Sequence, residues 1–246
     1  MSDITTPDSP AEPTTKPAAR WEDFIDIFYA PASVFARRIG SGWGLPLLVV
    51  TVLVSAIYLA NMGVMQPIMD AEFTRGMAAA MRKNPQITAD VMEKGRGIAE
   101  KFGIVFIIVG MPLTVFFVGL FQWVVGKFFD AKQTFGAALM VTAYAYMPKV
   151  LESALSGIQG LLMDPASLTG RYKLSLGAGR FMDPDGNPVI LALLGRVDVF
   201  TIWVTILIGI GLSVTGKISR GRAFAAAAMV WVLGALFVVL QAARSM

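Results

Sequence analysis

The stretch of sequence that decides the fold is FGIVFIIVGMPLTVFFVGLFQWVV, residues 102–125, which contains no charged side chain. A helix needs about 20 predominantly apolar residues to cross the hydrocarbon core of a bilayer, and this stretch meets that requirement. Four other apolar stretches have a comparable length: residues 45–65, 134–152 with an apolar continuation to 163, 197–215 and 223–242. The sequence therefore predicts an all-α integral membrane protein, a five-transmembrane-helix bundle over residues 45–242.

The composition agrees with a membrane location and excludes several classes of protein. Of the 246 residues, 55% are apolar and only 15% are charged, against about 25% charged in a typical soluble domain. The net charge of +4 does not predict nucleic-acid binding, because most basic residues flank apolar segments. The chain has neither Cys nor His, which removes metal sites built on sulfur or imidazole and catalytic triads with a His base. We therefore predict no cofactor, no metal site and no enzymatic activity.

The residues before the first span divide into a tail and an amphipathic region. Residues 1–20 are rich in Pro, Ser and Thr and predict a disordered tail. Residues 21–44 predict amphipathic juxtamembrane helices. The first of these has an apolar stripe at helical spacing, formed by Trp21, Phe24, Ile25 and Phe28. We expect this stripe to dock on protein, with the acidic residue Asp23 exposed on the opposite side.

The basic residues near the spans predict the orientation of the chain. Pro31 suits the first turn of a second short helix, which ends in Arg37 and Arg38, and we expect this arginine pair to face lipid headgroups. The short connections 127–132 and 217–222 are also basic, and with five spans they lie on the same side as the arginine pair. Because Lys and Arg accumulate in cytoplasmic loops, the sequence predicts a cytoplasmic N-terminus and a C-terminus outside.

Two longer connections are predicted to lie outside the membrane on the opposite side. Residues 66–101 show a helical repeat broken at Asn84-Pro85, which predicts a helical hairpin whose second helix continues into the second span. Residues 164–196 contain the turn-forming sequence DPDGN at 183–187 and predict a small extramembrane cap, either a hairpin or irregular. Because this oxygen-rich sequence lacks the other ligands of a calcium loop, we interpret it as a turn.

The third predicted span contains the polar residues that most need an explanation. Pro148 removes a helical hydrogen bond, which predicts a kink between Tyr144 and Pro148. Lys149 and Glu152 are i, i+3 neighbours that can form an ion pair. Charged residues inside a membrane usually mark function, but Lys149 lies in the outer third of the span, within reach of the interface. Two interpretations stay open: a structural pair, or a functional intramembrane polar site that includes Tyr144, Pro148, Lys149 and Glu152.

Small residues recur within the spans at spacings that allow helices to approach closely. Examples are Gly209 with Ser213 and Ser153 with Gly157. These spacings predict one packed bundle of spans. Gln122 lies near the end of the second span and has no predicted role.

Two short motifs carry a resemblance to a known family. The sequence DIFYAP at residues 26–31 resembles the Asp-aromatic-Pro motif that precedes the first span in the YIP (Ypt-interacting protein) family. The sequence AYAYMP at residues 143–148 resembles the motif in the third span of that family, with Tyr144 four residues before Pro148. Asp26 is one residue farther from Pro31 than in the family pattern, and Ala30 replaces the usual Gly.

Bacterial relatives of the family share the opening aromatic-Pro-x-x-x-Phe pattern, present here from Tyr29 and Pro31 to Phe35. The resemblance implies five spans, a cytoplasmic N-terminus and a candidate interaction motif formed by Asp26, Tyr29, Pro31 and Phe35. In eukaryotic members these motifs are associated with binding Rab-type GTPases and organising vesicle membranes.

We therefore predict a non-enzymatic, bacterial-type multi-pass protein of the cell inner (plasma) membrane that acts in membrane organisation or trafficking through protein or lipid interactions. Its expected partners are the lipid bilayer and a membrane protein or a second copy of the chain, with no nucleic acid. The alternative is a small transporter or lipid-handling protein that uses the polar site on the kinked third span.

Overall fold

The computed structural model describes residues 19–244, apart from seven side chains between positions 89 and 107. The predicted disordered tail, residues 1–20, lies outside the described residues except for its last two. Over the described residues the chain is helical, with one isolated bridge between Gly177 and Asp198 and no strand. The prediction of an all-α protein is confirmed.

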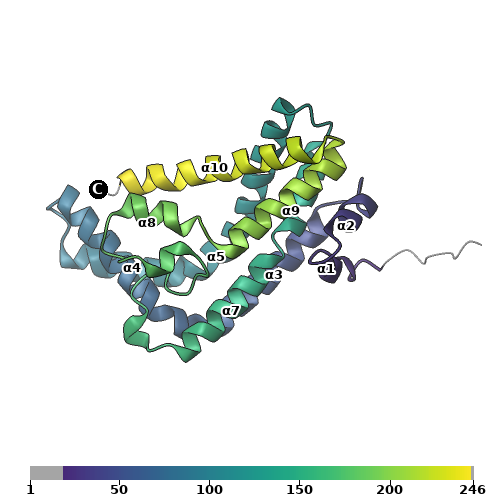
Figure 1. The fold of residues 1–246 in the computed structure, drawn as a ribbon. Coiled ribbons are helices and arrows are strands. Elements are labelled where there is room, and N and C mark those ends of the chain that lie inside the picture. Colours follow the sequence, from purple (N-terminus) through teal and green to yellow (C-terminus); the bar gives the residue numbers. More distant parts are fainter. Residues whose placement is uncertain (1–18, 245–246) are drawn as a thin grey trace, which may run out of the picture.

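The helices follow one another with short connections, and Figure 1 shows their arrangement. In chain order they are α1 (Asp23–Asp26), α2 (Pro31–Arg37), α3 (Gly44–Ala60), α4 (Met62–Lys83), α5 (Ala89–Phe128), α6 (Phe135–Ala145), α7 (Pro148–Leu162), α8 (Pro188–Gly195), α9 (Val199–Gly216) and α10 (Arg220–Arg244), with 3-10 turns η1 (Pro165–Ser167) and η2 (Ala178–Phe181) between α7 and α8. The turn between α9 and α10 lies at the same end of the bundle as α1 and α2, and the α4–α5 hairpin lies at the opposite end (Figure 1).

Three helical segments in the described residues are long and apolar enough to cross a membrane by themselves. They are Ile108–Phe128 within α5, Val199–Gly216 and Arg220–Arg244. The pair α3 and α4 also qualifies when taken together, but the two helices are bent by 85°. The third predicted span is divided into α6 and α7 at Tyr146 and Met147. The structure thus supports a membrane protein, while the count of five spans stays a prediction.

The core of the bundle lies around α6. Residues 138–145 of this helix are all buried, and α6 packs against α3, α5 and α9. Phe35, Met140 and Leu207 are among the largest fully buried side chains and belong to one apolar cluster. In contrast, α5 exposes a row of large apolar side chains that includes Phe106 and Phe117. This distribution is expected when lipid covers the outer helices and α6 is enclosed by protein.

A buried chain of hydrogen bonds connects α5, α6 and α9. The amide of Gln122 donates to Oε1 of Gln133 over 3.1 Å and accepts from the hydroxyl of Thr142 over 2.8 Å. The amide of Gln133 donates to the hydroxyl of Thr215 over 2.6 Å. All four side chains are buried. Gln122, which had no predicted role, is therefore a structural residue, because each polar group in this interior needs a partner.

The helix that begins the first predicted span bends before the predicted boundary at residue 65. Helix α3 ends at Ala60, and the 85° bend at Asn61 turns the chain into α4. The side-chain amide of Asn61 donates to the carbonyl of Ile57 over 2.8 Å, which satisfies a carbonyl at the end of α3. A Cβ added at Gly157 would lie 2.5 Å from the Asn61 side chain, and one at Gly160 would lie 2.1 Å from Val64. These glycines let α7 pack closely against the bend.

Substituting Gly160 tests this close approach. We expect Gly160→Ala to lower the stability of the folded protein by about 1 to 3 kcal/mol, since overpacking forces neighbouring backbone to shift. The matched control is Gly110→Ala in α5, where an added Cβ meets nothing within 4 Å and helix propensity favours Ala. Thermal unfolding in detergent measures both, and an equal midpoint for the two variants would contradict the proposed close packing.

The two long connections differ in structure. Residues 66–101 form the predicted helical hairpin, because α4 ends at Lys83 before the break at Asn84-Pro85 and α5 begins at Ala89. Residues 164–196 form an irregular cap that contains η1, η2 and the short helix α8; no β-hairpin is present in this segment. The predicted turn is present, with the amide of Gly186 donating to the carbonyl of Asp183 over 3.1 Å.

Candidate functional site: an ionic cluster under the N-terminal motif

Helices α1 and α2 fold back onto the bundle through apolar side chains. Ile27 and Phe35 are fully buried, and α2 packs against α9. The rings of Phe24 and Tyr144 lie with their centroids 5.7 Å apart. Docking of this segment on protein was predicted, and these contacts confirm it. Pro31 occupies the first turn of α2, where its missing N–H costs no helical hydrogen bond.

Only half of the predicted apolar stripe docks, since Phe24 and Phe28 pack against the apolar core. Trp21 and Ile25 were expected to be buried, yet they are 63% and 54% exposed. Asp23 was expected to be exposed, yet its side chain is fully buried. Both expectations were wrong, because the apolar spacing within α1 carries no information about charged partners supplied by α2.

Asp23 is the centre of a buried ionic cluster. Its Oδ1 pairs with Nε of Arg37 over 2.5 Å, and its Oδ2 pairs with Nε of Arg38. The hydroxyl of Tyr144 donates to Oδ2 of Asp23 over 3.3 Å. The arginine pair was predicted to face lipid headgroups, and this was wrong, because both guanidinium groups bind acidic side chains of the protein. The cluster joins α1, α2 and α6.

Asp26 and Tyr29 extend the cluster to the surface. Asp26 accepts hydrogen bonds from the hydroxyl of Tyr29 and from Nη2 of Arg37. The bond from Tyr29, followed by that from Arg37, holds the pKa of Asp26 below its ordinary value, because both stabilise the carboxylate. The bond to Asp26 in turn raises the pKa of Tyr29. Tyr29 as a whole is 71% exposed.

The four residues of the predicted interaction motif therefore divide into two pairs. Asp26 and Tyr29 are hydrogen-bonded to each other at the surface. Pro31 begins α2, and Phe35 is buried in the core. The central residue Asp23 was missed by the sequence analysis. The signal that points to it is the arginine pair at the end of α2, since such groups need anionic partners when they leave water.

The polar residues of the third span also separate in the structure. Tyr144 binds Asp23 in the N-terminal cluster. Nζ of Lys149 pairs with Oε2 of Glu152 over 2.5 Å and lies 3.5 Å from the hydroxyl of Thr201 in α9. About a quarter of each side chain of the Lys149–Glu152 pair is exposed. Pro148 is the first residue of α7. The four residues therefore do not bind one common set of partners.

Over the part of the chain that the structure describes, no group of three or more acidic side chains is placed to hold a metal ion. Asp185 of the DPDGN turn is instead 2.6 Å from Nε of Arg75, and Asp183 accepts from the backbone amide of Asp185 over 3.0 Å. These contacts assign the sequence to a turn that is attached to α4.

A comparison with family models identifies the chain. The model described as Yip1 domain matches residues 25–241. This protein belongs to the Yip1 domain family. The match begins within α1 and ends in the last turns of α10, so it contains both motif regions, the first four predicted spans and all but the last residue of the fifth. No curated protein and no solved structure gave a significant match. Membership of the Yip1 domain family confirms the resemblance drawn from the two motifs and agrees with a membrane protein.

Proposed function

We propose that this protein is a non-enzymatic, five-span protein of a bacterial inner membrane that acts in membrane organisation or trafficking by binding a membrane protein. The binding surface is the outward face of the N-terminal segment, formed by Trp21, Ile25 and Tyr29. The observation that carries the proposal is the rigid display of these three apolar side chains at i, i+4 and i+8, each more than half exposed. Exposed aromatic groups of this kind are typical of protein interfaces.

The ionic cluster explains why this surface is held in place. Asp23 connects α1 to both arginines of α2, and Tyr144 connects the same carboxylate to α6. A surface that is ordered before binding loses less conformational entropy when a partner binds. In the proposal, Asp26, Pro31 and Phe35 hold the segment on the bundle, and Tyr29 contributes to the binding surface.

The arginine pair at the end of α2 is not available to bind anionic lipid. Binding to an anionic membrane surface requires free basic residues. Here Arg37 and Arg38 are paired with acidic side chains. The proposed partner is a membrane protein or a second copy of this chain.

Site-specific photo-crosslinking in native membranes tests the proposal. A photoreactive amino acid at Ile25 should give adducts with one predominant protein, identified by mass spectrometry. The control position is Lys217, which is exposed in the turn between α9 and α10 at the same end of the bundle (Figure 1). Adducts with lipid alone at Ile25, or the same protein adducts from both positions, would contradict a specific protein surface there.

The proposed topology makes a separate prediction. Both short basic connections lie at the same end of the bundle, where the amide of Lys132 donates to the carbonyl of Gly216 over 2.9 Å, which supports placing them in the cytoplasm together with α1 and α2. Fusions of alkaline phosphatase to the connections 66–101 and 164–196 should be active, and a fluorescent C-terminal fusion should be dark. A C-terminus that behaves as cytoplasmic would exclude five spans.

The alternative function is a small transporter or lipid-handling protein that uses Lys149 and Glu152. The ion pair between α7 residues and its proximity to Thr201 of α9 favour this alternative, because charges inside a membrane often line a substrate pathway. A substrate flux in proteoliposomes that disappears with Lys149→Ala would support it.

The Lys149–Glu152 pair can be tested by a double-mutant cycle. Each single change to Ala leaves one charge unpaired, and we expect it to reduce stability by about 1 to 3 kcal/mol. Changing both residues to Ala should cost less than the sum of the single changes, since no unpaired charge remains. Thermal unfolding in detergent measures the cycle. Purely additive losses would show that the pair contributes no interaction energy.

A further inference from the structure

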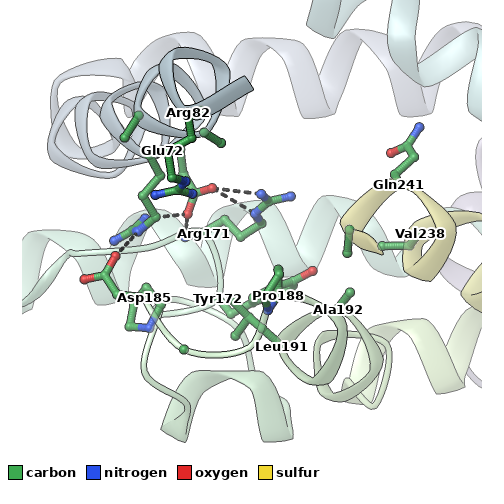
Figure 2. A pocket seen from close by; sticks show the side chains of 17 residues that line it. Glu72, Arg82, Arg171, Tyr172, Asp185, Pro188, Leu191, Ala192, Val238 and Gln241 are labelled. Atoms are coloured by element: carbon green, nitrogen blue, oxygen red, sulfur yellow. Dashed lines mark hydrogen bonds and ion pairs between the residues drawn. The ribbon is translucent and has the colours of Figure 1, made fainter. Parts of the chain in front are cut away.

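A pocket of about 580 Å³ lies at the end of the bundle away from the N-terminal cluster. Figure 2 shows its walls, which come from α4, the irregular cap, α8 and the last turns of α10. The volume is within the usual range for sites that bind small molecules. The pocket shares no lining residue with the proposed binding surface or with the Lys149–Glu152 pair.

The charges of this pocket leave one cation available. Its lining includes three arginines and two carboxylates. Glu72 binds Nη1 of Arg75 over 3.0 Å and Nη2 of Arg171 over 2.9 Å. Asp185 binds Nε of Arg75 over 2.6 Å. Both carboxylates are therefore used by Arg75 and Arg171, which fixes the cap against α4.

Arg82 is the remaining arginine of the pocket. It is exposed and has no ion-pair partner among residues 19–244. Figure 2 shows it on the same helix as Glu72, across the pocket from Gln241. A guanidinium group with all of its N–H donors free is well suited to bind phosphate oxygens.

The opposite wall is apolar. Leu191 and Ala192 of α8 face Val238 of α10 around the same pocket (Figure 2). Beside it, Ile190 and Leu193 of α8 are 47% and 46% exposed. Helix α10 carries Arg244 in its last turn here, and a basic residue at the end of a spanning helix favours the interface between lipid and water.

We propose that this pocket binds a phosphate group, with Arg82 as its anionic contact, and that the ligand is the headgroup of an anionic phospholipid whose glycerol and first acyl carbons rest on Leu191 and Val238. A free phosphate ion would bind Arg82 in the same way but has no apolar part. The apolar wall should therefore contribute to the affinity for a phospholipid and not to the affinity for free phosphate.

Native mass spectrometry of the full-length protein in detergent tests the site. Phosphatidylglycerol, phosphatidylcholine and inorganic phosphate are the three probes. We expect phosphatidylglycerol to bind more tightly than phosphatidylcholine, and Arg82→Gln to weaken its binding about tenfold, as for loss of a hydrogen bond to a charged group. Arg82→Lys should retain part of the affinity. The control is Arg220→Gln, an exposed arginine at the opposite end of α10.

A second variant fills the pocket without changing its charge. Ala78 lines the pocket one helical turn from Arg82 and is exposed, so Ala78→Trp should fold with an unchanged unfolding midpoint and also lose phosphatidylglycerol. If both variants lose phosphatidylglycerol binding, and inorganic phosphate does not compete with this lipid, the result supports a phospholipid headgroup as the ligand. Binding of inorganic phosphate alone that depends on Arg82, with no preference for lipid, supports a free phosphate instead. Equal lipid binding by Arg82→Gln, Arg220→Gln and the unchanged protein would overturn the proposal.

Discussion

Replacing Asp23 with Ala should detach the N-terminal segment and strongly destabilise the protein. The change leaves Arg37 and Arg38 without the buried carboxylate that both of them bind. Removing one partner of a buried ion pair typically costs about 3 to 5 kcal/mol. We expect a lower unfolding midpoint in detergent and rapid tryptic cleavage after Arg37 and Arg38, which the cluster protects in the unchanged protein.

The control for this experiment is Glu22→Ala. It removes the same charge from the neighbouring residue, which forms no ion pair in the described part of the chain, and surface changes of this kind usually alter stability by less than about 0.5 kcal/mol. If the two variants unfold alike and are cleaved alike, Asp23 does not hold the segment on the bundle.

Replacing Gln122 with Leu should be the second most damaging change. The volume is nearly conserved, but Oε1 of Gln133 loses its donor and the hydroxyl of Thr142 loses its acceptor. Each buried polar group left without a partner costs about 1 to 3 kcal/mol, and lipid around the bundle supplies no water to replace it. We expect a loss of about 2 to 4 kcal/mol in the free energy of unfolding.

Gln86→Leu is the matched control, because Gln86 is exposed in the turn of the α4–α5 hairpin. Its side chain makes no hydrogen bond within the described range. Unfolding midpoints in detergent compare the two variants. A Gln122→Leu protein as stable as Gln86→Leu would show that the buried network contributes nothing.

The helices were predictable because apolar length and breaking residues are local properties of a sequence. Asn84-Pro85 ends α4 where expected, and Pro148 begins α7 directly after the break in the third span. The bend at Asn61 was not predictable from hydropathy, because apolar residues continue through it to Met65. Its position depends on Gly157 and Gly160 in α7, because the missing side chains of these glycines leave room for the bent chain.

The candidate site was only half predictable for a related reason. Tyr29, Pro31 and Tyr144 lie in motifs that can be read along the chain, and both motifs fall within the range of the Yip1 domain match. Asp23 gains its importance from an arginine 14 residues later and a tyrosine 121 residues later. Periodicity within α1 predicted that this carboxylate faces solvent. The prediction failed because the spacing of apolar residues within one helix does not show that a charge is neutralised by another helix.

The most direct test of the proposed function is the yield of the protein adduct from a photoreactive residue at Ile25 in three backgrounds, each at equal amounts of folded protein. The backgrounds are the unchanged chain, Trp21→Ala with Tyr29→Ala, and Lys149→Ala with Glu152→Ala. We predict that the adduct is lost when the two exposed aromatic residues are removed and is retained when the intramembrane pair is removed. An adduct that survives the first double change and disappears with the second would contradict binding through the N-terminal surface.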